Sequence, residues 1–249
     1  MVKHFIIIAS AFSIGKRIAL DYFDTEQVKI KDIKKDMDHI IKECGDDVSI
    51  STHYIQTEEL GWDKVVKLDK FFAKVKLIDT KEEFVEILLK DRNLKGIDIA
   101  KYILTKIPCT HLKLEKMTYM CYADYLYQTG NKLFDDKIYA YKLGPVVKSV
   151  YDKYKKKWSK YLYEDDEKVY DEHDKNMPIK SRILASKDGI KKLISIDKTI
   201  EKYREYSASK LVNLTHQKST PWSMSGKGEE TYKEIEDDLI IKYHKYEEN

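Results

Sequence analysis

Apolar and polar residues follow two different periods along this chain, and its N-terminal part contains both. Phe5–Ala9 is a short apolar run, while Val48–Tyr54 alternates apolar and polar residues, so each predicts a strand. Phe71–Leu77 alternates in the same way and predicts another strand. In Ile30–Ile41 the apolar residues recur at spacings of three and four, which predicts a helix. The N-terminal part is therefore expected to be a small α+β unit.

A helix start and a polar stretch define the end of this unit. Thr80–Glu83 has the residues of a capping box, in which the threonine oxygen and the glutamate carboxylate bind free amides at a helix start. Asp91–Gly96 is polar, has no periodicity and ends in glycine, so we place a domain boundary there. The sequence thus predicts an α+β extension at residues 1–92 and a second domain at residues 97–245.

The second domain is expected to be mainly helical. Ile97–Leu104 has one apolar stripe, and that helix must stop before Pro108. Apolar residues recur at helical spacing through Leu114–Tyr125, and Gly130 is placed where a left-handed helix cap is expected. Two further stretches have helical spacing: Ile190–Tyr203 and Leu211–Leu214. The overall fold class predicted is therefore α+β, with a helical C-terminal domain.

Two segments of the second domain have other patterns. Leu133–Ala140 is an extended segment that leads into Gly144-Pro145-Val146. Proline suits the first turn of a helix, where its missing N–H would be unpaired in any case, so Pro145 predicts a helix start. Residues 158–180 are acidic, aromatic and irregular, and predict a hairpin or a mobile loop.

Charge and cysteine content exclude several classes of partner. The net charge is only +3, and four of the 46 basic residues are arginine, the residue preferred for phosphate and base contacts, so nucleic acid is not expected as a partner. No apolar run approaches the roughly 18 residues needed to cross a bilayer. Cys44, Cys109 and Cys121 have no metal-binding spacing, and an odd, unpaired set without an export signal indicates the cytoplasm.

Two motifs in the second domain indicate a resemblance to a known protein family. Leu112–Tyr119 begins a predicted helix with lysine and tyrosine residues that continues to Gly130, and Gly144–Val146 follows it after a turn and an extended segment. Thr215–His216 and Pro221–Trp222 form a second motif near the end. This order resembles the Panacea antitoxin domain, also called SocA-like or GepA-type phage-associated protein, over about Ile97–Tyr243.

The resemblance implies a non-enzymatic antitoxin of a bacterial or phage toxin–antitoxin system that neutralises a cognate protein toxin by binding it. The family's toxins have unrelated chemistries, and include alarmone-synthetase-like enzymes and other inhibitors of translation. One branch instead acts as an adaptor that delivers its toxin to a protease. No cofactor or metal is implied, residues 1–92 would be a variable extension, and assembly into a homo-oligomer stays open. The alternative from another class is a nucleic-acid-associated regulator of its own operon.

The resemblance also supplies candidate toxin-binding residues, all within the motifs. Gly144 and Pro145 are interpreted as a structural joint, with toxin contact as the alternative. Thr215-His216 is interpreted as a hydrogen-bonding tie rather than as a catalytic site that uses His216 with a nearby acid. Trp222 is interpreted either as an anchor packed on the domain or as an interface hot spot. Lys116 is interpreted either as a lysine with a buried aliphatic stem or as a binding group. The candidates are Lys116, Tyr119, Phe134, Gly144, Pro145, Val146, Thr215, His216 and Trp222.

Two other segments resemble a phosphate-binding loop and a metal site, but lack the residues or the geometry that such sites need. Ser10–Arg17 is expected between a strand and a helix, as a phosphate-binding loop is, but it lacks the first glycine and the Ser/Thr after the lysine. Adjacent aspartates in an extended segment point to opposite faces, so Asp135 and Asp136 are interpreted as turn residues and not as a metal site.

Overall fold

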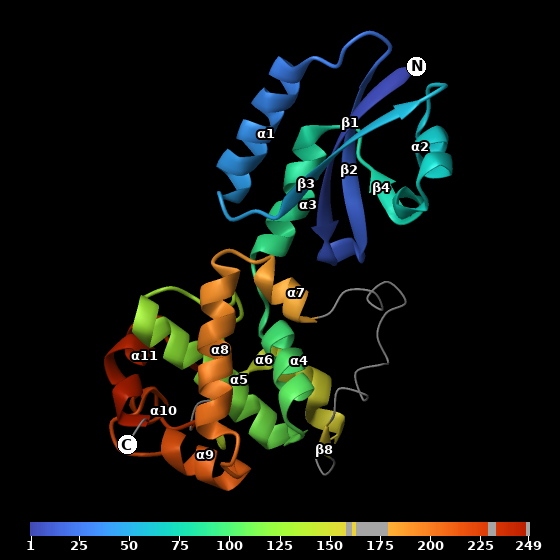
Figure 1. Cartoon of the computed structure of the whole chain (residues 1–249). Helices are drawn as coiled ribbons and strands as arrows, with labels where there is room; N and C mark the ends of the chain where they lie inside the picture. The colour runs from blue at the N-terminus through green and yellow to red at the C-terminus, as the bar shows by residue number, and fades with distance from the viewer. Residues whose placement is uncertain (158–160, 163–178, 229–232, 248–249) are drawn as a thin grey trace. The chain divides into compact units, whose positions relative to one another are not determined.

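The computed structural model describes residues 1–157, 161–162, 179–228 and 233–247. The chain divides into two compact units, the first of which contains Met1–Asn93 and Ala185–Lys187. The second unit contains the remaining described residues. The chain combines helices with small sheets whose strands are mainly antiparallel, so the predicted α+β class is confirmed (Figure 1). The predicted domain bounds, 1–92 and 97–245, stay predictions.

The first unit is a four-stranded sheet in the order β3-β1-β2-β4 with helices on both of its faces (Figure 1). Neighbouring strands are antiparallel except for β2 and β4, which are parallel. Its elements are β1 (Val2–Ala11), β2 (Lys16–Asp24), α1 (Ile30–Cys44), β3 (Ile50–Thr57), α2 (Trp62–Leu68), a 3-10 helix (Lys70–Lys74), β4 (Val75–Leu77) and α3 (Lys81–Arg92).

The apolar run in β1 follows from its central place in this sheet. Ile7 belongs to a core that α1 and α3 complete on one face, where Phe84 is fully buried. Ile6 belongs to a second core on the other face, completed by Val65 of α2 and by Phe72. A strand covered on both faces needs apolar residues at consecutive positions, which is why β1 does not alternate.

The segment Ser10–Arg17 does not lead into a helix, and that prediction was wrong. The chain makes a 3-10 turn at Phe12–Ile14, and Gly15, with a φ of 62°, brings it into the antiparallel strand β2. The backbone amides of Phe12 and Ser13 donate to the Asp91 carboxylate, at 2.7 and 2.9 Å. The turn does bind an anion through its amides, but the anion is a side chain of the same unit.

The strand predicted at Phe71–Leu77 is only partly present. Lys70–Lys74 forms a 3-10 helix, and β4 takes up only the last three residues of the stretch. The side chain of Asp69 accepts a hydrogen bond from the Phe71 amide at 2.8 Å, which starts the 3-10 turn. A local cap therefore overrides the alternating pattern.

The second unit contains most of the helices. Small sheets connect them, with β5 pairing with β8, and β6 lying between β7 and β9. Its elements are α4 (Gly96–Lys106), β5 (Cys109–Thr110), α5 (His111–Thr129), β6 (Ile138–Tyr141), β7 (Gly144–Val147), α6 (Lys148–Tyr154), β8 (Tyr161–Leu162), α7 (Ile179–Leu184), α8 (Gly189–Tyr203), α9 (Ala208–Thr215), α10 (Pro221–Met224), β9 (Lys233–Glu234), α11 (Asp237–Tyr243) and a 3-10 helix (His244–Glu247).

Helix α5 is the central element of this unit. It contacts α4, α8, α9, α11 and β7, and every residue from Leu114 to Leu126 is buried (Figure 1). It ends as predicted at Gly130, which has a φ of 68° and donates its amide to the Leu126 carbonyl. The predicted helices at Ile97–Leu104, Ile190–Tyr203 and Leu211–Leu214 are confirmed as α4, α8 and α9.

Pro145 does not start a helix, and that prediction was wrong. It lies in β7, opposite Ala140 of β6, and the next helix begins only at Lys148. Strand β7 is at the edge of its sheet, where a proline can be accommodated because its missing N–H interrupts no ladder. Gly-Pro-Val therefore forms one strand of a hairpin.

The hairpin or loop predicted at residues 158–180 lies largely outside the described residues. Of that stretch, Tyr161 and Leu162 pair with β5, and Ile179 begins α7. Within the described parts of the chain, no helix is both long enough and apolar enough to span a membrane.

The helix start predicted at Thr80 is the N-cap of α3, and it can be tested by mutation. The Thr80 side chain accepts a hydrogen bond from the Glu83 amide at 3.2 Å, while the Glu83 carboxylate is paired with Lys76. We expect Thr80→Ala to lower the free energy of unfolding by about 1 kcal/mol, and Thr80→Ser to keep it, because the serine oxygen can still cap the helix. Urea denaturation of both variants measures this, and equal losses would contradict the capping role.

Candidate functional site

Lys116 of α5 is fully buried and binds the backbone of the hairpin. Its Nζ donates a hydrogen bond to the Pro145 carbonyl at 2.5 Å. Burial lowers the pKa of this amine to about 7, although the nearby carboxylates of Glu115 and Glu247 favour the charged form. A buried lysine with a specific carbonyl partner holds β7 against α5.

Gly144 lies where no other residue fits without strain. Its φ is +104°, a region that residues with a Cβ rarely adopt. A Cβ at this position would be 2.8 Å from Thr215 Oγ1 and 3.0 Å from Lys116 Nζ. The glycine thus allows the hairpin, α5 and α9 to meet, and it brings residues from both sequence motifs together.

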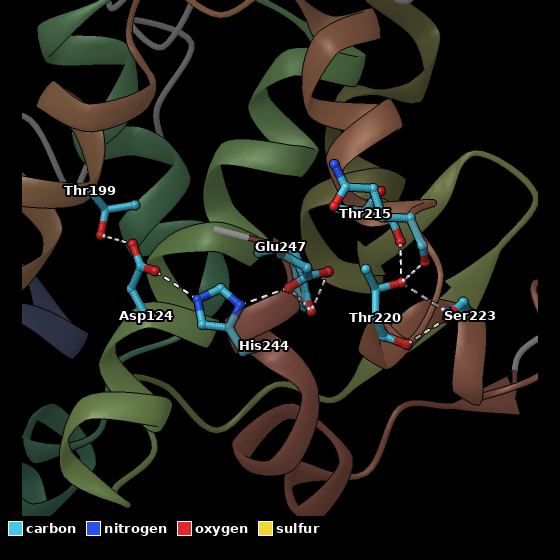
Figure 2. Close-up of polar contacts among 9 residues, drawn as sticks. Asp124, Thr199, Thr215, Thr220, Ser223, His244 and Glu247 are labelled. Carbon is cyan, nitrogen blue, oxygen red and sulfur yellow. Dashed lines mark hydrogen bonds and ion pairs between the residues drawn. The ribbon is translucent and has the colours of Figure 1, made fainter. Parts of the chain in front are cut away.

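The second motif folds into a tight hydrogen-bonded connection between α9 and α10. The Thr215 hydroxyl donates to the Val212 carbonyl at 2.9 Å. The Thr215 carbonyl accepts from the Thr220 hydroxyl at 2.7 Å (Figure 2). Thr220 in turn caps α10 by accepting from the Ser223 amide at 3.3 Å. The Thr215 hydroxyl is therefore already engaged as a donor.

His216 and Trp222 stack on each other at the end of this connection. Their ring centroids are 3.7 Å apart and the ring planes differ by 1°. The Trp222 Nε1 donates to the Tyr141 carbonyl of the β6–β7 hairpin at 2.8 Å. Partial burial, with a contribution from the charge on Lys116, lowers the pKa of His216. The pair attaches the α9–α10 connection to the hairpin.

Tyr119 begins a chain of buried polar contacts that ends at α8. Its hydroxyl donates to the Glu247 carboxylate at 2.9 Å, and Glu247 Oε2 lies 2.7 Å from His244 Nδ1. His244 Nε2 is 2.7 Å from Asp124 Oδ1, and the Thr199 hydroxyl donates to Asp124 Oδ2 at 2.6 Å (Figure 2). The chain joins α5, α8 and the 3-10 helix that follows α11.

The partners of His244 determine its protonation state. Both ring nitrogens face carboxylates, Asp124 on one side and Glu247 on the other, and ionised carboxylates only accept hydrogen bonds. Burial disfavours the charged ring, but the two hydrogen bonds and the charges behind them outweigh it and raise the pKa of His244 to about 9. At neutral pH the ring is therefore a buried imidazolium.

Glu115 is a further buried carboxylate of α5. Its Oε2 accepts from the Val147 amide of β7 at 3.3 Å, and its Oε1 lies 3.5 Å from His111 Nε2. Burial raises the pKa of Glu115, while His111 and Lys116 oppose that shift. The Glu115 carboxylate therefore binds the end of β7 at Val147, and Lys116 binds the same strand at Pro145.

The other two candidates have packing roles. The Phe134 ring packs against Tyr122 in a tilted arrangement, with 4.6 Å between ring centroids. It also lies near Gly96, where a Cβ would be 3.5 Å from Phe134 Cε2 and 2.5 Å from Val147 Cγ1. Val146 is 4% exposed in β7. Of all the candidate residues, only His216 is more than marginally exposed, so a contact with a partner would have to act through the surface that they support.

The described residues hold no group of three His, Cys, Asp or Glu side chains placed to bind a metal ion. Asp136 accepts a hydrogen bond from the Gly96 amide at 2.7 Å, which is a helix-start contact at α4. Cys44, Cys109 and Cys121 are free thiols and buried.

Residues 114–223 match the family described as antitoxin SocA-like, Panacea domain. This part of the chain is similar to the SocA-like Panacea domain. The resemblance stated from the sequence is thereby confirmed, and the matched residues contain every candidate named above. Comparison with curated proteins and with solved structures gave no match.

Several residues that hold the Panacea domain together were not found from the sequence. Asp124 is a single charge within the buried run Met120–Leu126, and this signal could have identified it. His244 and Glu247 lie beyond the matched residues, in a polar stretch with no motif. Their role becomes visible only when the partners on α5 are known.

The glycine of the Panacea hairpin can be tested against a matched glycine. Gly130 also has a positive φ, +68°, but a Cβ added there would meet nothing within 4 Å. We expect Gly144→Ala to lower the free energy of unfolding by at least about 2 kcal/mol, from strain and from crowding against Thr215. Gly130→Ala should cost only about 1 kcal/mol, since backbone strain acts alone there. Thermal or urea unfolding compares them, and an equal or smaller loss for Gly144→Ala would contradict the close approach.

The buried imidazolium predicts a pH-dependent stability. A raised pKa means that His244 contributes stability fully below its unfolded value of 6.5, and that this contribution is lost as the pH rises through about 9. We expect His244→Gln to be less stable than the natural protein by roughly 3 kcal/mol near pH 6, because a buried charge partner is lost. The difference should shrink toward pH 9.5.

Measuring both proteins by denaturation at several pH values isolates this effect. Above pH 7, the lowered pKa of Lys116 makes the free energy of unfolding rise with pH, opposite to the effect of His244. Because Lys116 is present in both proteins, its contribution largely cancels when the two are compared. A difference that stays constant from pH 6 to pH 9.5 would rule out a charged His244.

Proposed function

We propose that this protein is an antitoxin that neutralises a cognate protein toxin by direct binding. The observation that carries the proposal is the match of residues 114–223 to the SocA-like Panacea antitoxin domain. The site geometry supports a function without a chemical step, because its hydroxyl, amine and carboxylate groups are buried and engaged in internal hydrogen bonds. The mechanism we propose is steric, with no chemical step: a folded surface occupies the toxin's active site or the path of its substrate.

The motif residues would act in this mechanism as a scaffold. Lys116, Gly144 and Thr215 join α5, the hairpin and α9, and Trp222 fixes the following connection. Toxin contacts would then come from exposed side chains over these elements, where aromatic anchors contribute most of the affinity. We propose that residues 1–92 form a variable extension that contributes to the choice of toxin.

The partner class follows from the same proposal. We propose a toxin that inhibits translation, with an alarmone-synthetase-like enzyme as the first candidate, and we place the pair in the cytoplasm. Delivery of the toxin to a protease is the alternative mechanism within this function, and repression of the operon is the alternative function.

The test is a co-expression rescue with matched variants. The neighbouring open reading frame is induced alone, with the full chain, and with the Gly144→Ala or Gly130→Ala chain. We expect growth to stop with the neighbour alone, to recover with the full chain and with Gly130→Ala, and to recover less with Gly144→Ala, because that substitution disturbs the scaffold. Growth curves and colony counts measure the outcome.

Toxin level and operator binding separate the mechanisms. An unchanged toxin level on immunoblots during rescue supports blocking, and a protease-dependent fall supports delivery. If no neighbouring gene is toxic, the proposal fails. A salt-dependent shift of operator DNA by the purified protein would then support the regulator.

A further inference from the structure

Strand β3 is an edge strand of the first unit's sheet. It pairs with β1 along its whole length, from Ile50 opposite Ala9 to Thr57 opposite Val2, in an unbroken antiparallel register. Its other side has no strand partner among the described residues (Figure 1). A strand of eight residues therefore presents one row of backbone donors and acceptors without a partner in the sheet.

The two edges of this sheet differ in how they are protected. At the opposite edge, β4 has only three residues and contains Lys76, and short or charged edges resist further pairing. Strand β3 has no lysine, arginine, aspartate, glutamate or proline, in a chain in which 36% of the residues are charged. It also has no bulge in its pairing with β1. Charged residues, proline and a bulge, three of the usual devices against edge pairing, are therefore absent from β3.

We propose that β3 pairs antiparallel with β3 of a second copy of this chain, across a two-fold axis. The two four-stranded sheets would become one continuous sheet. A two-fold axis places each strand beside an identical one, so any charge on β3 would face a like charge nearby. The absence of charged residues from β3 removes this repulsion, and main-chain hydrogen bonds along the strands provide the attraction.

The symmetry also restricts the register. A two-fold axis perpendicular to the sheet keeps each residue on its own face, and directly opposite residues of an antiparallel pair share a face. The axis must therefore pass beside a residue, and the two central choices are His53 and Tyr54. With the axis at His53, two imidazoles face each other and repel when protonated, and this ring already packs on Phe71 and Phe72, at 5.4 and 5.5 Å.

The axis at Tyr54 gives the better set of cross-strand neighbours. The Tyr54 side chain is 57% exposed and would meet its copy as an aromatic pair. On the same face Thr52 would lie opposite Gln56, and on the other face His53 would lie opposite Ile55. We therefore assign the axis to Tyr54, which brings the two copies of this residue to about 5 Å between Cα atoms.

Cysteine crosslinking tests both the pairing and the register. In the full-length chain, Tyr54→Cys is expected to form a disulfide-linked dimer under mild oxidation with copper phenanthroline. Ser51→Cys is the matched control on the same exposed strand, because in this register the two copies of residue 51 are about 20 Å apart. The native cysteines are buried and give little background.

Light scattering on the uncrosslinked protein tests the assembly itself. The natural chain and a Leu68→Lys variant, changed at a residue 62% exposed on α2, are expected at twice the monomer mass of 29.4 kDa at tens of micromolar. Tyr54→Lys is expected at the monomer mass with unchanged circular dichroism, because it places like charges at the axis. A monomeric natural chain, a dimer that survives Tyr54→Lys, or equal crosslinking of both cysteine variants would overturn the proposal.

Discussion

The second unit depends on one constraint, which is that its central helix is buried on all sides and still carries ionisable groups. Glu115, Lys116, Tyr119 and Asp124 all lie within the buried part of α5. A polar group removed from water destabilises the fold unless it finds a partner, and a charge does so more strongly. The hairpin, α8 and the 3-10 helix at His244 must therefore approach α5 at fixed points. The arrangement of the surrounding elements follows from these contacts as much as from apolar packing.

Local signals were sufficient for most helices and failed where a distant residue decides the structure. The apolar spacing in α5 and the glycine at its end specify the helix without tertiary information. Pro145 suits a helix start equally well as an edge strand, and only its pairing with Ala140 decides between them. The turn before β2 has the same ambiguity, which Asp91 resolves from the far end of the unit. The partners of Asp124 and Glu247 could not be predicted, because each contact joins residues that no period relates.

The burial of the Panacea motifs changes how a family signature of this kind is interpreted. Lys116 and Trp222 satisfy backbone carbonyls of one hairpin, at Pro145 and Tyr141. Residues with such internal contacts preserve the scaffold, and leave the exposed side chains over it free to differ. A single scaffold can in this way support binding to proteins that share no chemistry, which fits the antitoxin function proposed here.

The long reach of the His244 contacts also has a consequence during synthesis. His244 follows its partner Asp124 by 120 residues, and Glu247 follows Tyr119 by 128. At a translation rate of about 5–20 residues per second, α5 is synthesised roughly 6–24 s before these partners are made. During that interval Tyr119 lacks its acceptor Glu247, and Asp124 can pair with Thr199 but not yet with His244. The polar contacts around α5 are therefore complete only after residues 244–247 have been made.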